Sequence, residues 1–137
     1  MRLCFWLLLA LVAVPVAGLR AEDASDEDSS YWMKKKLEHS QKIFAALSQA
    51  DFESMEASAR MLGKLNQIEK FVRGRDSAYR AQLDIFRFAV EEVRKEAETK
   101  DIDGATLAFH QMTLSCVNCH KLLRAEIQTK AKPTKSP

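Results

Sequence analysis

Hydrophobic residues recur every three or four positions along most of this 137-residue chain, a spacing typical of amphipathic helices. No alternation of the kind that marks a β-strand competes with it. Proline is absent from 16 to 132 and glycine is scarce, so little would interrupt long helices. Helices are expected at 31–49, 52–71, 77–99 and from an Asp103 cap to Thr129. The sequence therefore predicts an all-α fold, an antiparallel four-helix bundle.

Each expected helix has one apolar stripe that would face the core. In the first helix the stripe comprises Met33, Leu37, Ser40, Phe44 and Leu47. In the second it comprises Phe52, Met55, Ala59, Leu62 and Leu65. In the third it comprises Tyr79, Leu83, Phe86, Val90, Val93 and Ala97. In the fourth it comprises Ala105, Phe109, Met112, Cys116, Cys119 and Leu123, so both thiols should point into the core.

Polar residues mark the expected helix starts and faces. Asp51 and Asp76 suit N-caps of the second and third helices, and one of Ser29–Ser30 could cap the first. The lysine run 34–36 is expected to lie on a solvated face. Gly63 lies mid-helix, at a cost of about 1 kcal/mol relative to Ala. It would either allow close approach of another helix or of a cofactor, or simply be tolerated.

The N-terminus has the pattern of a secretory signal peptide. Arg2 precedes an apolar run over 3–17, and Val16 and Gly18 suit the −3 and −1 positions of a cleavage site. The run is short for a bilayer span, so we expect cleavage after residue 18 and export to the periplasm. Cleavage would also remove Cys4.

The mature chain would then have three parts: an acidic flexible spacer at 19–29, the helical domain at 30–129, and a disordered basic tail at 130–137. The formal net charge of the full chain is +2, which is too small to suggest nucleic acid or anionic lipid as a partner. We expect no membrane contact beyond the leader.

The remaining two cysteines lie in the run Cys116-Val117-Asn118-Cys119-His120. C-x-x-C-H is the attachment pattern of a c-type haem. Thiols three residues apart share a helix face and can form thioethers with two vinyl groups, and His120 can then bind the iron as proximal ligand. A redox dithiol would need a βαβ context, and zinc would need a second Cys/His pair; the sequence has neither. We therefore expect one haem c, covalently held by Cys116 and Cys119.

A second axial ligand would have to come from upstream, because none of the residues after His120 is Met or His. Met112 and His110 lie on the same helix as His120 and cannot reach the opposite haem face. His39 falls off the apolar stripe of the first helix and is expected at the surface.

Three methionines remain as upstream candidates. Met55 and Met61 are expected to be core residues of the second helix. Met33 heads the stripe of the first helix, where the spacing leaves a core role and a ligand role equally open.

With a haem motif on the fourth helix of a bundle, the chain resembles the class II c-type cytochromes, the cytochrome c′ and cytochrome c556 group. The likeness covers most of the mature chain and is strongest from Asp101 to His120. It implies that Arg124, four residues past the haem histidine, lies near the haem edge; Leu123 departs from the aromatic residue usual before it. It also implies that Met33 occupies the family's distal position and binds the iron, as in cytochromes c556.

The resemblance implies an exported mono-haem electron carrier with His120 and Met33 as axial ligands, which would meet redox partner proteins. The alternative is a five-coordinate, cytochrome c′-like protein that binds NO or CO on an open distal face. A third possibility is a haem-free helical interaction protein with the two cysteines in a disulfide.

Two further expectations concern activity and assembly. The sequence has no paired carboxylates, nucleophile triad or Gly-rich phosphate loop, so we do not expect an enzyme. Many bundle cytochromes dimerise through their first two helices, so a homodimer with Trp32 or Ile43 in the contact is possible here.

Overall fold

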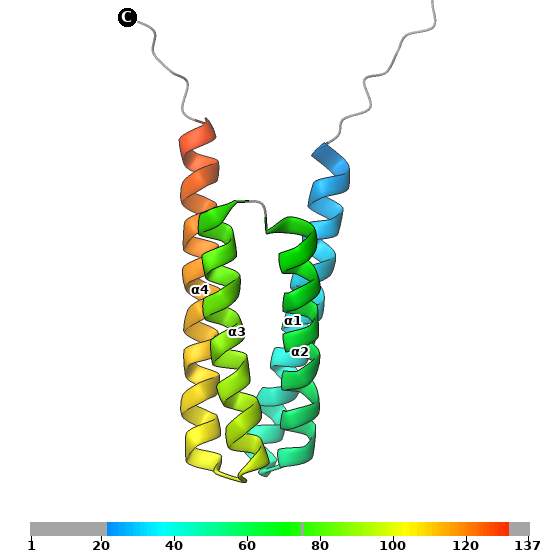
Figure 1. The fold of residues 1–137 in the computed structure, drawn as a ribbon, viewed down its shortest axis with the longest axis vertical. Helices are drawn as coiled ribbons and strands as arrows, with labels where there is room; N and C mark the ends of the chain where they lie inside the picture. Colours follow the sequence, from blue (N-terminus) through cyan, green and yellow to red (C-terminus); the bar gives the residue numbers. More distant parts are fainter. Residues whose placement is uncertain (1–21, 75, 132–137) are drawn as a thin grey trace, which may run out of the picture.

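The computed structural model describes residues 22–74 and 76–131, which form four helices. They are α1 (Glu22–Gln49), α2 (Phe52–Arg73), α3 (Ser77–Glu98) and α4 (Ile102–Ala131). Successive helices run in opposite directions, and α1 packs on α2, α2 on α3 and α3 on α4 (Figure 1). The expected all-α bundle of four antiparallel helices is therefore confirmed as an architecture. In the described part of the chain, no helix is both long and apolar enough to cross a membrane.

Two of the expected caps are confirmed. The Asp51 carboxylate accepts a hydrogen bond from the Ser54 amide at 3.1 Å, and the Asp76 carboxylate accepts one from the Tyr79 amide at 2.8 Å. The third cap lies two residues earlier than expected. The carboxylate that accepts from the Gly104 amide, at 2.9 Å, belongs to Asp101.

Asp103 is therefore not the cap of α4 and lies in its first turn instead, where a negative charge also suits the helix dipole. The start of α1 also differs from expectation. The helix begins at Glu22, so 22–29 is helical rather than a flexible spacer, and Ser29–Ser30 lie inside the helix rather than at its cap. At the other end, α4 extends two residues into the expected tail. The expected leader, 1–18, and the rest of the tail, 132–137, lie outside the described residues.

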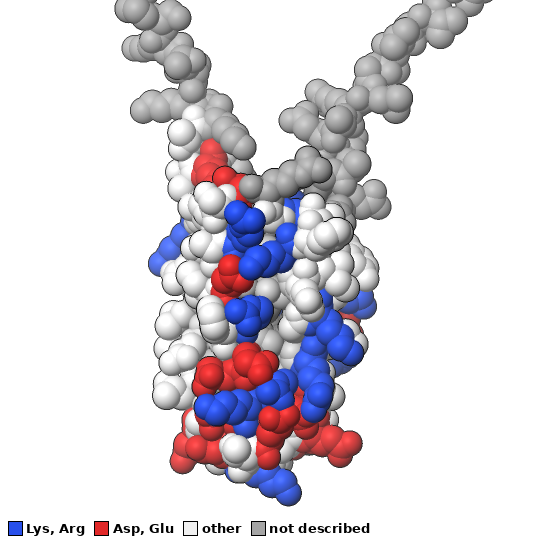
Figure 2. Space-filling model, in the orientation of Figure 1, with Lys and Arg blue, Asp and Glu red and all other residues white. Residues whose placement is uncertain are grey.

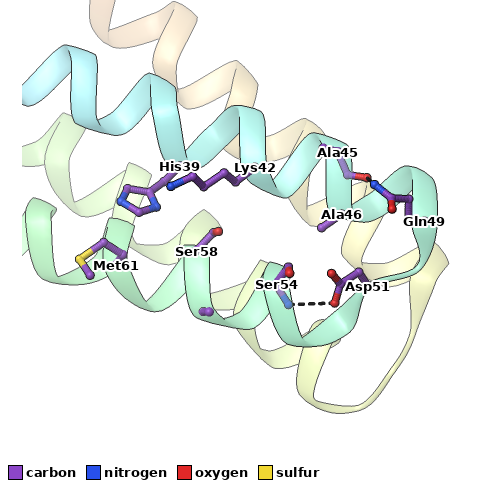
Figure 3. A pocket seen from close by; sticks show the side chains of 10 residues that line it. His39, Lys42, Ala45, Ala46, Gln49, Asp51, Ser54, Ser58 and Met61 are labelled. Carbon is purple, nitrogen blue, oxygen red and sulfur yellow. Dashed lines mark hydrogen bonds between the residues drawn. The ribbon is translucent and has the colours of Figure 1, made fainter.

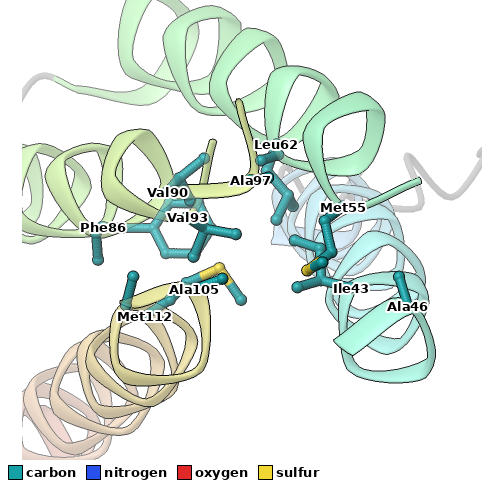
Figure 4. Close-up of a cluster of buried hydrophobic side chains, with 13 residues drawn as sticks. Ile43, Ala46, Met55, Leu62, Phe86, Val90, Val93, Ala97, Ala105 and Met112 are labelled. Atoms are coloured by element: carbon teal, nitrogen blue, oxygen red, sulfur yellow. The ribbon is translucent and has the colours of Figure 1, made fainter. Parts of the chain in front are cut away.

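The apolar core fills the half of the bundle that ends in the α1–α2 and α3–α4 turns (Figure 4). The stripes expected on α2, α3 and α4 supply most of it, as predicted. Its members are Ile43, Ala46, Met55, Ala59, Leu62, Phe86, Ala89, Val90, Val93, Ala97, Ala105, Ala108 and Met112. Among residues 31–42 of α1, none belongs to this cluster, and on α4 its last described member is Met112, with Cys116 packed against its edge. We call the other half of the bundle, which holds the α2–α3 loop, the open end.

The stripe expected on α1 is wrong as a core face at Leu37 and Phe44, whereas Leu47 packs against the core as expected. Leu37 is 59% exposed and Phe44 is 65% exposed, whereas Trp32 and Ile43 are buried. The reason is that α1 and α4 touch much less than the other neighbouring helices and diverge toward the open end (Figure 1). The flank of α1 that points to α4 is therefore left uncovered. The suggested dimer contact through Trp32 or Ile43 is also wrong, because both side chains are used inside the bundle.

Charged side chains gather on the α2–α3 face, most densely away from the α2–α3 loop (Figure 2). Arg94 pairs with Glu91 at 2.6 Å and also with Glu98, which lies 3.6 Å from Arg60 on α2. Exposed pairs of this kind contribute little to stability. They keep this face of the bundle solvated. The C-x-x-C-H motif lies on another helix, α4.

Candidate functional site

The two thiols lie on the inner flank of α4, just past the end of the apolar core. Cys116 and Cys119 are half-buried and free, and Cys116 packs against the edge of the core cluster. His120, the next residue, is exposed on the same helix. The motif is therefore reachable from outside while its thiols still face the interior, as the sequence predicted.

The surroundings of the thiols affect their protonation. Burial raises the pKa of both Cys116 and Cys119, and the Lys36 ammonium on α1 partly offsets this effect for each of them. The Lys36 ammonium lies 4.7 Å from the centre of the Phe86 ring, and Phe86 belongs to the core cluster against which Cys116 packs.

A contact between two aromatic rings fixes the register of α1 against α4. The rings of Phe44 and Phe109 lie with centroids 6.1 Å apart, at the level of the half of the bundle that holds the apolar core, which we call the closed half. Met33 precedes Phe44 by eleven residues, and His120 follows Phe109 by eleven. Eleven residues make three helical turns to within about 20° and a rise of about 16 Å. Because the two helices are antiparallel, this register predicts that Met33 and His120 lie at a similar level on the flanks that face each other.

We call these facing flanks the α1–α4 seam, formed by Met33, Leu37 and Phe44 on α1 and by Phe109, Cys116, His120 and Ile127 on α4. Leu37, Phe44 and Ile127 are exposed, and Met33, Phe109 and Cys116 are half-buried. A seam with apolar side chains on both flanks lacks a partner that would shield them from water. Cys116, His120 and Met33 of the predicted haem site therefore belong to one partly uncovered apolar strip.

The interior of the open end holds a polar cluster that the sequence reasoning missed. Glu69 on α2 is fully buried, and its carboxylate pairs with the Lys36 ammonium at 2.6 Å and accepts a hydrogen bond from the Tyr79 hydroxyl at 2.5 Å. Asn66, also fully buried, donates to the Leu83 carbonyl at 3.0 Å. Three helices thus converge on one buried carboxylate next to the motif.

Lys36 corrects the expectation for the lysine run, because its side chain is only 12% exposed while Lys34 is exposed. A signal for this cluster was present in the sequence. Lys36 lies four residues after Trp32, and Glu69 continues the apolar stripe of α2 four residues after Leu65. Charged residues at inward-facing positions predict a buried pair when they occur on two helices.

His39 lies on a different face of α1 from Met33. It lines a pocket of about 460 Å³ between α1 and α2, with Lys42, Ser58 and Met61 around it (Figure 3). Burial and the nearby Lys42 lower the pKa of His39. The pocket belongs to the closed half, so His39 is not brought to the motif. Met61, expected in the core, is 41% exposed in this pocket and that expectation is wrong.

The other residues considered as haem ligands or haem neighbours lie either in the core, as the sequence predicted, or at the surface. Met55 and Met112 are fully buried in the core, away from the seam, and His110 is exposed. Arg124 is exposed on α4, one turn beyond His120. Of the upstream methionines that the structure describes, only Met33 lies on the flank of α1 that faces the motif.

Among the residues that the structure describes, no three His, Cys, Asp or Glu side chains gather into a group that could hold a metal ion by themselves. Comparison with family models, with curated proteins and with solved structures gives no match to this chain.

Proposed function

We propose that this chain is an exported mono-haem c-type cytochrome that carries electrons. In this proposal Cys116 and Cys119 hold the haem through thioethers, His120 is the proximal ligand and Met33 the distal ligand. The observation that carries the proposal is the place of the C-x-x-C-H motif, on the inner flank of α4 where the apolar core ends and the α1–α4 seam widens.

The residues around the seam suit a haem. Both thiols are free, and the imidazole of His120 is accessible. Leu37 and Phe44 present apolar surface that a porphyrin would remove from water, and burying it would favour binding by about 25 cal/mol per Å². A flat apolar group bound in the seam would extend the apolar core into the open end. This supports a haem site over a dithiol at the surface.

Haem iron held in this way would supply a one-electron centre. His120 and Met33 would hold the iron from opposite helices, because both lie at the same level of the seam. A histidine and a methionine as axial ligands favour a high reduction potential. Leu37 and Phe44 would keep water from the distal side. Arg124 would lie near the haem edge, as the resemblance to class II cytochromes implies.

The test is an absorption spectrum of the protein expressed with c-type maturation machinery, in the oxidised and dithionite-reduced forms. We expect a sharp reduced α-band and, when oxidised, a charge-transfer band from the thioether to the iron. A C116A/C119A variant is the matched control and should carry no covalent haem. A broad high-spin reduced spectrum that shifts with CO or NO would instead support the gas-binding alternative. Absence of covalent haem in the unmodified protein would eliminate both.

A further inference from the structure

The buried pair of Lys36 and Glu69 has no role in the proposed haem attachment. Glu69 is fully enclosed, and each of its carboxylate oxygens has a partner: the Lys36 ammonium at 2.6 Å and the Tyr79 hydroxyl at 2.5 Å. Burial and this hydrogen bond raise the pKa of Tyr79, so the phenol remains a donor. Two groups, one from α1 and one from α3, thus fix the position of the carboxylate.

The ion pair is oriented with its positive end toward the seam. Lys36 is on α1, which forms one flank of the seam, whereas Glu69 is on α2, which packs on α1 and α3 but not on α4, so the cation is on the helix nearer the motif. The ammonium also lies 4.7 Å from the centre of the Phe86 ring, at the boundary of the apolar core where Cys116 packs.

A buried ion pair is an unfavourable way to fill a bundle interior. Removing two charges from water costs several kcal/mol each, and apolar residues of similar volume often stabilise a fold as well or better. Buried charges are therefore frequent at functional sites, where their field acts on a reacting group through a medium of low dielectric constant. Here the group within reach of that field is the one held by Cys116 and Cys119.

We infer that the Lys36–Glu69 pair is an electrostatic device that raises the reduction potential of iron held at Cys116, Cys119 and His120. The inference rests on the proposed function. Reduction adds one electron to the iron and so lowers its positive charge by one unit. A fixed cation nearby favours the reduced state, and the more distant Glu69 carboxylate opposes this effect only in part.

The experiment measures reduction potentials by spectroscopic titration of the haem-loaded full chain. Glu69→Gln removes the opposing anion and keeps an acceptor for the Tyr79 hydroxyl, so its potential should lie above that of the unmodified protein. The double variant K36M/E69Q removes both charges, and its potential should lie below that of the unmodified protein because the nearer cation is lost. The double variant leaves no orphaned charge, so it gives an answer even if Glu69→Gln does not fold.

Lys35→Met is the matched control, because it removes one lysine charge from the next position of the same helix. Lys35 pairs with Glu38 at 3.0 Å and is 42% exposed. Any shift in the control should vanish at high ionic strength, whereas the shifts from the buried pair should persist.

An unchanged or raised reduction potential in K36M/E69Q would overturn the inference. The inference would also fail if the shifts in Glu69→Gln and K36M/E69Q vanished at high ionic strength, as is expected for Lys35→Met. The proposed function fails in a different way, through missing covalent haem or a high-spin spectrum in the unmodified protein. The two failures are therefore distinguishable in one set of samples.

Discussion

Trp32 and Met33 are neighbours on α1 and differ sharply in their surroundings. Trp32 is 8% exposed and its ring meets that of Tyr31 edge-on at 5.4 Å, whereas Met33 is half-buried on the flank that faces α4. Adjacent helix positions differ by about 100°, so Trp32 covers the interior of the open end and Met33 borders the seam. A methionine at the border of an uncovered strip can turn its sulfur toward a group bound there.

The first prediction concerns Met33 as the distal ligand. In haem-loaded protein, Met33→Ala should abolish the thioether charge-transfer band and convert the iron to a high-spin form, because no other Met faces the motif at this level. Optical spectra of the oxidised and reduced forms measure the change. Met61→Ala, on the far flank of α2, is the control and should leave the spectrum intact. A low-spin spectrum unchanged in Met33→Ala would show that another residue binds the iron.

The helices and most of their inner faces were predictable because local signals agreed with tertiary packing. The stripe from Leu83 to Ala97 on α3 is buried as its spacing predicted, and Asp51 and Asp76 cap the helices that they precede. On α4, two aspartates two residues apart competed for the cap, and the pattern alone did not favour Asp101 over Asp103.

The α1 face and the polar cluster were less predictable for a physical reason. Helix periodicity identifies an apolar flank but not what covers it, so Leu37 and Phe44 looked like core residues and are exposed at the seam. In a sequence, a charged residue at an inward-facing position looks like a break in the apolar stripe, because its partner on another helix is not apparent. Lys36 and Glu69 are 33 positions apart, and only the fold brings them together.

The second prediction concerns Met55, which is completely buried in the core. Met55→Ala should lower the free energy of unfolding by about 2–5 kcal/mol, because the cavity it leaves can close only in part. Urea denaturation of the haem-free protein, followed by circular dichroism, measures the loss. The same substitution at the exposed Met61 should stay within about 0.5 kcal/mol of the unmodified protein. Equal losses at the two positions would contradict the assignment of the core.

The third prediction concerns Gly63, in the middle of α2. A Cβ atom added there would meet nothing within 4 Å, so the glycine is not required for close approach of another helix. Gly63→Ala should therefore stabilise the haem-free protein by about 0.5–1 kcal/mol through helix propensity alone.

Thermal or urea denaturation measures this gain, and Gly74→Ala is the control of opposite sign, because its Cβ would collide with the Lys70 carbonyl oxygen. Gly63→Ala should also load haem normally. Reduced loading with unchanged stability would instead indicate that the cofactor approaches α2 at this glycine.

The fourth prediction concerns acid and the exposed Glu38. Hydrogen bonds from Lys42 and Lys35 lower its pKa from an ordinary value of 4.5 to about 2. Because the folded state holds the proton less tightly than the unfolded state, the contribution of Glu38 is present above pH 4.5 and lost as the pH falls toward 2. The free energy of unfolding of Glu38→Gln should therefore be lower than that of the unmodified protein at neutral pH, and the two values should converge in acid. Since the pair is exposed, added salt should also remove the difference.

The fifth prediction tests the buried pair in the haem-free protein. Lys36→Met should lower the free energy of unfolding by about 3–5 kcal/mol, because it leaves the Glu69 carboxylate buried without a cation. K36M/E69Q should recover most of this loss, since the remaining amide is neutral and still accepts from the Tyr79 hydroxyl. Lys35→Met, at an exposed position, should change stability little. If the double variant were as unstable as Lys36→Met, the loss would come from the contact of Lys36 with the Phe86 ring and not from an orphaned charge.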